Sequence, residues 1–363
     1  MESIYYVISW ACHRKCVHCY EDRFRPYTKG KLSAVVDEAK RNWPRIVANL
    51  PERMTYIDLD TSAPSPGSPP ESPAGFAERR GRIILSGGET LLDEIREPVL
   101  YPLLEALRDR YAGAGGVNVV VQTTGDLVTE RIVDELLERG IWMLSVAGMD
   151  DFHVGMTGAK REKLQERLIR WFEAAGMARS GSKLGEAKRH QEEGPSYSFF
   201  GATPDAWIGK LWPRGRAWAN DLSTATMADN FCNRWSGGRN FLNHRYAGSE
   251  VAIEPTGDVY PCCMKTKLPI GNLTEEPLTE ILDSLVGHPV YEAINAGQPE
   301  RMGLSLGWDV DAFVAHARTT TPKGRDYRNL CIGCDKFHEA VLKPVVAALR
   351  AARAVQRQRL AAE

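Results

Sequence analysis

The sequence lacks any apolar run that approaches the about 18 consecutive residues of a membrane-spanning helix. Its first residues lack the basic stretch and the following apolar stretch of a secretion signal. Neither charge sign is in excess, since 46 lysines and arginines stand against 47 aspartates and glutamates. Such a balance does not favour binding to nucleic acid or to an anionic membrane. We therefore expect a cytoplasmic protein that acts on a small molecule or a peptide.

Cysteine is also scarce, with eight in 363 residues. An even count would suit four disulfides in a secreted domain, but a cytoplasmic chain of this length is kept reduced and uses cysteine for metal binding or catalysis. The length and a hydrophobic content of 43% allow one large core or two domains. The cysteines therefore direct the search for function.

Three cysteines, Cys12, Cys16 and Cys19, fall within eight residues, directly after an apolar segment. Their spacing does not put them on one helix face, where neighbours lie three and four residues apart. They can surround one corner of an iron-sulfur cube, which normally takes four thiolates, and three would leave one iron open. The alternative is a zinc knuckle with His13 or His18 as the fourth ligand.

The first 180 residues alternate strand-like and helix-like segments. Strands are predicted at 4–9, 82–86, 117–122 and 143–147, and helices at 32–50, from about 98, at 129–139 and at 160–175. Repeated strand-helix units predict a parallel sheet, in which functional loops follow the carboxyl ends of the strands. The cysteine loop and the loops after the next three strands should therefore share one rim. A proline- and serine-rich stretch at 60–80 interrupts the pattern as an exposed insertion.

The cysteine loop resembles the Cys-x3-Cys-x2-Cys signature of the radical SAM (S-adenosylmethionine) enzymes. In that family the open iron is chelated by SAM, whose reductive cleavage gives a 5′-deoxyadenosyl radical. Gly87-Gly88-Glu89-Thr90 resembles the family's Gly-Gly-Glu motif, which binds the SAM amino group, and glycines do allow a close backbone approach to a ligand. The resemblance thus implies a SAM site at the rim of the sheet.

Further segments carry weaker resemblances to the same family. Thr124 follows the third strand, and Ser145 lies in a Ser-x-Asp-Gly-like segment in which Ala147 replaces the acid. The expected SAM contacts are Gly87, Gly88, Glu89, Thr90, Thr124 and Ser145. Arg216, in a Gly-Arg-Ala segment, is a candidate contact to a substrate or SAM carboxylate, and His153 is a candidate proton carrier, although a loop histidine with an ordinary structural partner is the alternative.

The other five cysteines lie in the C-terminal third of the chain. Gly257-x4-Cys262 after a predicted hairpin, and the Cys331-x2-Cys334 pair, resemble the SPASM and twitch domains that bind auxiliary 4Fe-4S clusters. Five cysteines imply one such cluster, with Cys232, Cys262, Cys331 and Cys334 as ligands. Cys263 is either the rival of Cys262 or a thiol in the substrate cavity. Zinc at this second site is the alternative.

The expected fold is α/β: a partial (β/α)6 TIM-like barrel over 1–220, a small α+β auxiliary-cluster domain over 221–340 and a C-terminal helix over 341–363. The expected cofactors are SAM, a SAM-binding 4Fe-4S cluster and one auxiliary 4Fe-4S cluster, with a flavodoxin- or ferredoxin-type electron donor. We expect hydrogen abstraction from a substrate carbon and oxidation or rearrangement of a small molecule, since the first strand begins at Ile4 and no leader-binding domain precedes it. A peptide maturase and a non-catalytic zinc or iron-sulfur module are the alternatives.

Overall fold

The computed structural model describes residues 1–59, 76–155, 157–180, 194–201, 210–233 and 240–360. Its central feature is a nine-stranded sheet in the order β11-β10-β9-β1-β4-β5-β6-β8-β7. The parallel strands are β1 (Ser3–Ser9), β4 (Arg82–Gly87), β5 (Asn118–Thr123), β6 (Met143–Ala147), β7 (Ala178–Arg179), β8 (Ser196–Phe200) and β9 (Glu250–Ile253). The other two, β10 (Asp258–Tyr260) and β11 (Gly271–Asn272), are antiparallel.

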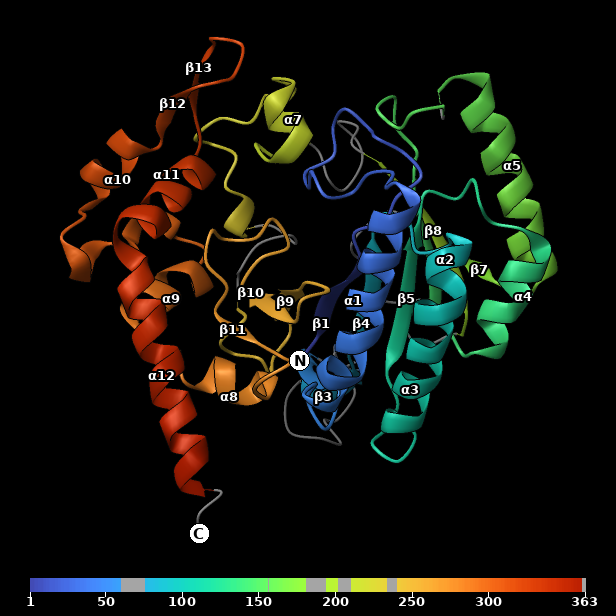
Figure 1. Cartoon of the computed structure of the whole chain (residues 1–363), viewed down its shortest axis with the longest axis horizontal. Helices are drawn as coiled ribbons and strands as arrows, with labels where there is room; N and C mark the ends of the chain where they lie inside the picture. Colours follow the sequence, from blue (N-terminus) through green and yellow to red (C-terminus); the bar gives the residue numbers. More distant parts are fainter. Residues whose placement is uncertain (60–75, 156, 181–193, 202–209, 234–239, 361–363) are drawn as a thin grey trace, which may run out of the picture.

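Helices cover the outer face of the parallel strands (Figure 1). They are α1 (Lys29–Ala48), α2 (Asp93–Ile95), α3 (Tyr101–Tyr111), α4 (Glu130–Glu138) and α5 (Ala159–Ala174), and the π-helix η1 (Arg96–Leu100) joins α2 to α3. The predicted α/β fold with a parallel sheet is confirmed. The six predicted barrel strands correspond to β1, β4, β5, β6 and β8, which have at least five residues each, and to the two-residue β7 at the sheet edge.

The alternation of side chains along the strands separates the core from the barrel interior. On β1, Ile4, Tyr6 and Ile8 are at most 1% exposed and belong to the main core beneath the helices. Successive side chains of a strand point to opposite faces. Tyr5 therefore faces the interior, and by the same rule so do Ser86 on β4 and Gln122 on β5, which Tyr5 contacts. The interior is thus more polar than the helix-covered face.

The C-terminal region continues the sheet, because β9 pairs in parallel with β1. Its other elements are α7 (Gly215–Ala219), η3 (Phe231–Asn233), α8 (Leu278–Asp283), α9 (Pro289–Asn295), η4 (Pro299–Arg301), η5 (Leu304–Leu306), α10 (Val310–His316), β12 (Arg318–Thr320), β13 (Asp326–Arg328), α11 (Leu330–Phe337), η6 (His338–Leu342) and α12 (Lys343–Leu360). Because β9 belongs to the main sheet, the domain boundary expected near residue 220 stays a prediction. In the part of the chain that the structure describes, no helix is long and apolar enough to cross a membrane.

The predicted interruption at 60–80 falls largely outside the described residues, which exclude 60–75. Residues 76–80 form β3 (Phe76–Arg80), which pairs antiparallel with β2 (Thr55–Leu59) in a separate two-stranded sheet. This hairpin lies outside the order of the main sheet, so the parallel register of β1 and β4 continues past it.

Candidate active site and metal centres

A cavity of about 190 Å³ opens inside the sheet and is bounded by both halves of the chain. Eleven residues singled out from the sequence line it: Cys12, Cys16, His18, Cys19, Gly87, Gly88, Thr124, Ala147, His153, Arg216 and Cys263. The other expected residues do not line it: Glu89, Thr90, Ser145, Cys232, Cys262, Cys331 and Cys334. The structure therefore brings the first cysteine set and the glycine turn to one cavity, and places the four auxiliary cysteines elsewhere.

The cysteine loop is held by Arg216, which is 9% exposed. Its guanidinium donates to the carbonyls of Cys16 at 2.8 Å and Phe24 at 2.7 Å, and also to those of Glu21 and Asp22. The backbone N–H of Arg216 donates to the Cys19 carbonyl at 2.8 Å. These contacts show that Arg216 positions the loop. Arg216 also lines the cavity, so its expected contact to a substrate or SAM carboxylate stays a prediction.

The glycine turn after β4 packs directly on the cysteine loop. A Cβ atom on Gly88 would lie 2.2 Å from the carbonyl oxygen of Ala11 and 2.8 Å from the Cβ of Cys12. The backbone N–H of Gly88 donates to Ser9 at 3.1 Å, and that of Glu89 donates to Ala11 at 2.8 Å. Gly88 is therefore required for close approach of two backbones, whatever ligand the turn also contacts.

The Glu89 carboxylate points away from the cavity and joins two loops. It accepts hydrogen bonds from the Thr123 hydroxyl at 2.7 Å, from the Thr124 N–H at 2.8 Å and hydroxyl at 2.7 Å, and from the Leu91 N–H at 2.9 Å. Thr90 similarly donates to the Gln122 carbonyl at 2.7 Å. In the described residues the turn therefore presents Gly87 and Gly88 to the cavity, and Glu89 fixes their position relative to Thr124.

Asp126 connects the same rim to the cysteine loop and was not expected from the sequence. Its carboxylate accepts from His13 at 2.8 Å and from Arg14 at 2.5 Å. Burial opposes its ionisation, but hydrogen bonds from His13, Thr124 and Arg14 hold the pKa of Asp126 well below its usual range. His13 therefore has a partner other than a metal. The sequence feature that could have indicated this role is the position of Asp126, an acidic residue two positions after Thr124 and just after the end of a strand.

Donor spacing tests which metal the cysteines fit. Zinc binds sulfur at about 2.3 Å in tetrahedral geometry, so its ligand atoms lie about 3.8 Å apart. Among the described residues, the one group of three donor atoms within 4.8 Å of one another is His18, Asp150 and His153, and it contains no cysteine. Neither cysteine set contains three donor atoms within 4.8 Å of one another among the described residues, so neither is closed around a single ion.

The histidine group lies on the wall of the cavity. His153 Nδ1 and Asp150 Oδ1 are 2.8 Å apart, and the ring centroids of His153 and His18 are 4.5 Å apart with 62° between the ring planes. Burial, then the neighbouring His153, lowers the pKa of His18 to about 4. His153 thus has an ordinary structural partner and also faces the cavity, which leaves its role as a proton carrier a prediction.

The floor of the cavity carries polar groups that the sequence analysis missed. The Tyr5 hydroxyl lies 2.7 Å from Ser86 Oγ and donates to Gln122 at 3.2 Å. Glu250, at the start of β9, also lines the cavity, next to Cys263. Burial raises the pKa of Glu250. Tyr5, Ser86 and Gln122 are polar residues in otherwise apolar strands, and this pattern could have indicated a polar cavity floor.

The four expected auxiliary cysteines lie together. Burial, then Asp335 and then Cys232, Cys262 and Cys331, raises the pKa of Cys334. The set is assembled from η3, the segment after β10 and helix α11. Asn329 caps α11 by accepting from the Cys331 N–H at 2.9 Å, and its amide donates to the Thr226 carbonyl at 2.7 Å. One fully buried asparagine therefore fixes α11 against the segment that leads to Cys232.

Arg214 is the counter-charge of this set. It forms a two-pronged ion pair with Asp335, at 2.6 and 2.8 Å. Its guanidinium also lies close enough to Cys262, Cys331 and Cys334 to interact with their charges. Four thiolates around a metal cluster are anionic, so a fixed cation beside them is favourable. Arg214 interacts with the auxiliary cysteines, and Arg216, two residues later, holds the N-terminal cysteine loop. One short segment therefore contacts both cysteine sets.

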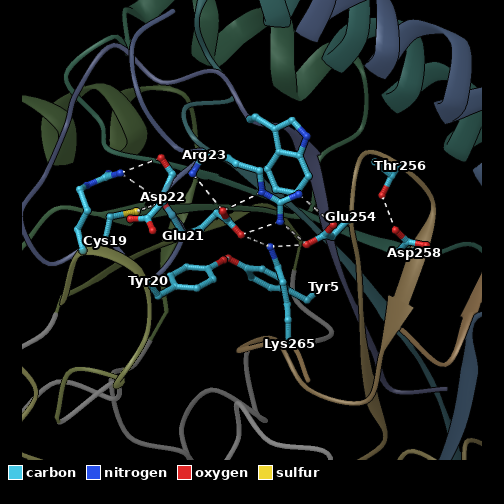
Figure 2. Close-up of polar contacts among 12 residues, drawn as sticks. Tyr5, Cys19, Tyr20, Glu21, Asp22, Arg23, Glu254, Thr256, Asp258 and Lys265 are labelled. Carbon is cyan, nitrogen blue, oxygen red and sulfur yellow. Dashed lines mark hydrogen bonds and ion pairs between the residues drawn. The ribbon is translucent and has the colours of Figure 1, made fainter. Parts of the chain in front are cut away.

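A network of four charges joins the cysteine loop to the C-terminal hairpin (Figure 2). Arg23 bonds Glu21 at 2.8 Å and Glu254 at 2.6 Å, and Lys265 bonds the same two carboxylates at 2.7 and 2.8 Å. Burial opposes ionisation of Glu21, but Arg23 and Lys265 hold its pKa at about 2. Arg23 also lies over the Trp10 ring, 3.5 Å from its centroid. Each of the two carboxylates is thus paired with both cations, and these ion pairs connect the cysteine loop with Glu254 and Lys265 of the C-terminal region.

Comparison with known proteins identifies part of the chain. Residues 245–300, which include Cys262 and Cys263, match the family model of SPASM, an iron-sulfur cluster-binding domain. This segment is similar to an iron-sulfur cluster-binding domain. The match bears out the resemblance of the C-terminal cysteine region to SPASM domains, and with it the expectation of iron-sulfur binding there. No curated protein matches the chain.

Solved structures of low identity are also similar to this chain. BtrN in complex with AdoMet and 2-DOIA has 14% identity and a TM-score of 0.41, with 82% of this chain and 88% of that one covered. Native anSMEcpe with AdoMet and the Cp18Cys peptide has 15% identity and a TM-score of 0.37, covering 96% and 98%. Streptococcus suis SuiB bound to S-adenosylmethionine has 13% identity and a TM-score of 0.37, covering 81% and 67%. No substrate is assigned to this chain from them.

Proposed function

We propose that the protein is a radical SAM enzyme that oxidises a small molecule at a carbon bearing a hydroxyl or amino group. Cys12, Cys16 and Cys19 would hold the cluster that, with SAM and a reductant, supplies a 5′-deoxyadenosyl radical able to remove a hydrogen atom from a substrate carbon. A flavodoxin- or ferredoxin-type protein is the proposed electron donor. The chain's own part is to place the substrate, exclude water and accept a proton.

The proposed SAM site uses the rim of the cavity. Gly87, Gly88 and Thr124 line it next to the cysteine loop and can contact the ligand directly. Glu89 acts from behind them, through its hydrogen bonds to the Thr124 loop. Ser145 lies deeper, 3.0 Å from Ser198 Oγ, so we propose that it shapes the interior rather than binding the amino-acid part of SAM.

One observation carries the proposal of an oxidation: adjacent residues belong to the two sites. Cys263 lines the cavity, while Cys262 belongs to the auxiliary set. Cys263 belongs to an apolar cluster with Ala252 and Cys331, against which Cys262 and Tyr5 also pack. A cluster at the auxiliary cysteines would offer one-electron acceptor chemistry beside the substrate.

Glu250 is the proposed proton acceptor. Removing a hydrogen atom from a hydroxyl-bearing carbon leaves a carbon radical, which becomes a carbonyl when it loses one proton and one electron. Glu250 reaches the cavity floor as a carboxylate whose pKa is raised by burial, which makes it a stronger base than an exposed glutamate. The proton would pass to its carboxylate and the electron to the auxiliary site.

The cavity volume favours a small molecule over a peptide. About 190 Å³ must hold the reacting part of the substrate and part of SAM, so a peptide could insert only one side chain. Peptide modification is the second candidate, because a side chain could enter in this way. A non-catalytic iron-sulfur or zinc module is the third.

The test is anaerobic reconstitution of the full chain, followed by assay of 5′-deoxyadenosine with aminocyclitols, amino sugars and peptides. Deuterium transfer from one substrate carbon into 5′-deoxyadenosine, with a product two hydrogens lighter, is expected. Glu250→Gln should keep the iron content but lower product formation by about 10²- to 10⁴-fold, the usual contribution of a general base. Absence of 5′-deoxyadenosine under reduction would leave the non-catalytic module, and a mass change in a peptide alone would favour the second candidate.

A further inference from the structure

His338 is a buried histidine for which the described residues provide no hydrogen-bond partner. It is 1% exposed, and neither ring nitrogen has a partner within the described chain. A buried polar group without a hydrogen-bond partner destabilises the folded state. Two such atoms in one ring indicate a partner that the described residues do not supply.

The position of His338 indicates what that partner is. It caps the C-terminus of α11, in helical conformation, and follows Cys331 and Cys334 by seven and four residues. Residues three, four and seven apart share one face of a helix. The imidazole therefore lies on the face of α11 that carries two of the auxiliary cysteines.

Arg214 connects the imidazole with the rest of the set. Burial, then the charge of Arg214, lowers the pKa of His338 to about 4, so the ring is neutral at pH 7 and has one N–H to donate. The same guanidinium interacts with Cys262, Cys331 and Cys334. Arg214 also interacts with Cys232, so one cation neighbours both the imidazole ring and all four thiols.

We propose that His338 donates an N–H···S hydrogen bond to the auxiliary cluster held by Cys232, Cys262, Cys331 and Cys334. It acts as a positioning residue rather than a ligand, because four thiolates complete the coordination of a four-iron cube. Hydrogen bonds to the sulfurs are one of the factors that set the reduction potential of such a cluster. A donor stabilises the more negative reduced state, so His338 raises the potential and makes the cluster a better electron acceptor. The inference rests on the proposed auxiliary cluster.

The experiment isolates that cluster by replacing Cys12, Cys16 and Cys19 with Ala in the full chain, which is then reconstituted anaerobically. Iron content and the midpoint potential, followed by electron paramagnetic resonance, are compared for this parent and for His338→Leu, His338→Asn and His338→Gln. The matched control is His288→Leu, because His288 also has a buried ring nitrogen without a partner among the described residues but caps α9, away from the cysteines in sequence.

His338→Leu should keep about four irons per chain and shift the midpoint potential to a more negative value, beyond any shift in His288→Leu. His338→Asn or His338→Gln should restore part of the shift, because an amide N–H replaces Nδ1–H or Nε2–H. An unchanged potential in His338→Leu overturns the proposal, and so does loss of iron, which would make His338 a ligand. If the parent protein binds no four-iron cluster, the auxiliary cluster on which the inference rests does not exist. That result is distinct from an unchanged potential and from loss of iron in His338→Leu.

Discussion

Cys262 and Cys263 show how one peptide bond can separate two functions. Cys262 neighbours Cys331, Cys232 and Cys334, whereas Cys263 lies beside Glu250 in the cavity wall. Adjacent side chains cannot easily serve one cube, and here they face different sites. The geometry therefore favours Cys262 as the ligand and Cys263 as a cavity thiol.

The pair gives a prediction at the scale of single residues. Cys262→Ala should lower reconstituted iron from about eight to about four per chain, because the auxiliary cube loses a ligand. Cys263→Ala should leave the iron content unchanged, and Cys263→Ser provides the matched polar control at the same position. Iron and sulfide analysis with the visible absorbance of the clusters decides it. If iron fell in Cys263→Ala and not in Cys262→Ala, the two roles would have to be exchanged.

The residues that could be predicted from the sequence are those whose chemistry depends on their own side chain. The cysteines are of this kind, since few other roles suit such spacing in a reduced chain. Glu89 and Arg216 are different, because their roles depend on which carbonyls, hydroxyls and amides lie beside them in the fold. Arg216 lies about 200 positions from the carbonyls it holds. No local pattern could have shown those contacts.

At the scale of elements, α12 is attached to the C-terminal region through buried charges. Glu276 is 2% exposed and accepts from Arg353 at 2.8 and 2.9 Å and from Arg357 at 2.8 Å. Arg353 also donates to the Ile270 carbonyl at 2.9 Å. Burial opposes ionisation of Glu276, but the two arginines lower its pKa below the ordinary value of 4.5. These contacts attach α12 beside β11 and α8.

Glu276→Gln should destabilise the chain by roughly 3 kcal/mol, because it leaves two arginines without their buried partner. The folded pKa is lowered, so the stabilisation is present above pH 4.5 and is lost as the pH falls below that value. The variant should therefore show a flatter loss of stability below pH 4.5 in urea unfolding of the apo protein. Glu275→Gln is the control, because Glu275 is 57% exposed in its pair with Arg350. Equal effects of the two substitutions would contradict the prediction.

The elements themselves were largely predictable, and the pairing of some was not. The helix expected at 129–139 is α4, capped by Thr129, whose side chain accepts from the Ile132 N–H. Such signals are local. The parallel pairing of β9 with β1 joins residues about 247 positions apart, and periodicity carries no information about that partner. The cysteine spacing alone therefore indicated a second cysteine set. That this set lies near the cavity depends on the long-range pairing of β9 with β1, which the spacing does not indicate.

At the scale of the whole molecule, the ion network of Figure 2 lets the two cysteine sites depend on each other. Glu254 follows β9 and is 3% exposed, Lys265 lies three residues after Cys262, and Arg23 and Glu21 belong to the cysteine loop. Lys265 adopts a positive φ of 62°, and its backbone N–H donates to the Cys262 carbonyl at 3.0 Å. The side chain that holds the N-terminal loop thus extends from the turn that carries Cys262.

This arrangement predicts that a change in the C-terminal hairpin loosens the SAM-binding cluster. Glu254→Gln should destabilise the apo chain by about 2 kcal/mol, because Arg23 and Lys265 lose one of two buried counter-charges. It should also speed loss of iron to a chelator in the Cys331→Ala/Cys334→Ala background, where the cluster at Cys12, Cys16 and Cys19 is the one under test. Asp258→Asn is the matched control, because Asp258 lies in the same hairpin and its carboxylate accepts from Thr256 and Asn272, which do not belong to the ion network. If Asp258→Asn released iron as fast as Glu254→Gln, general loosening of the hairpin would explain the effect and the network would have no specific role.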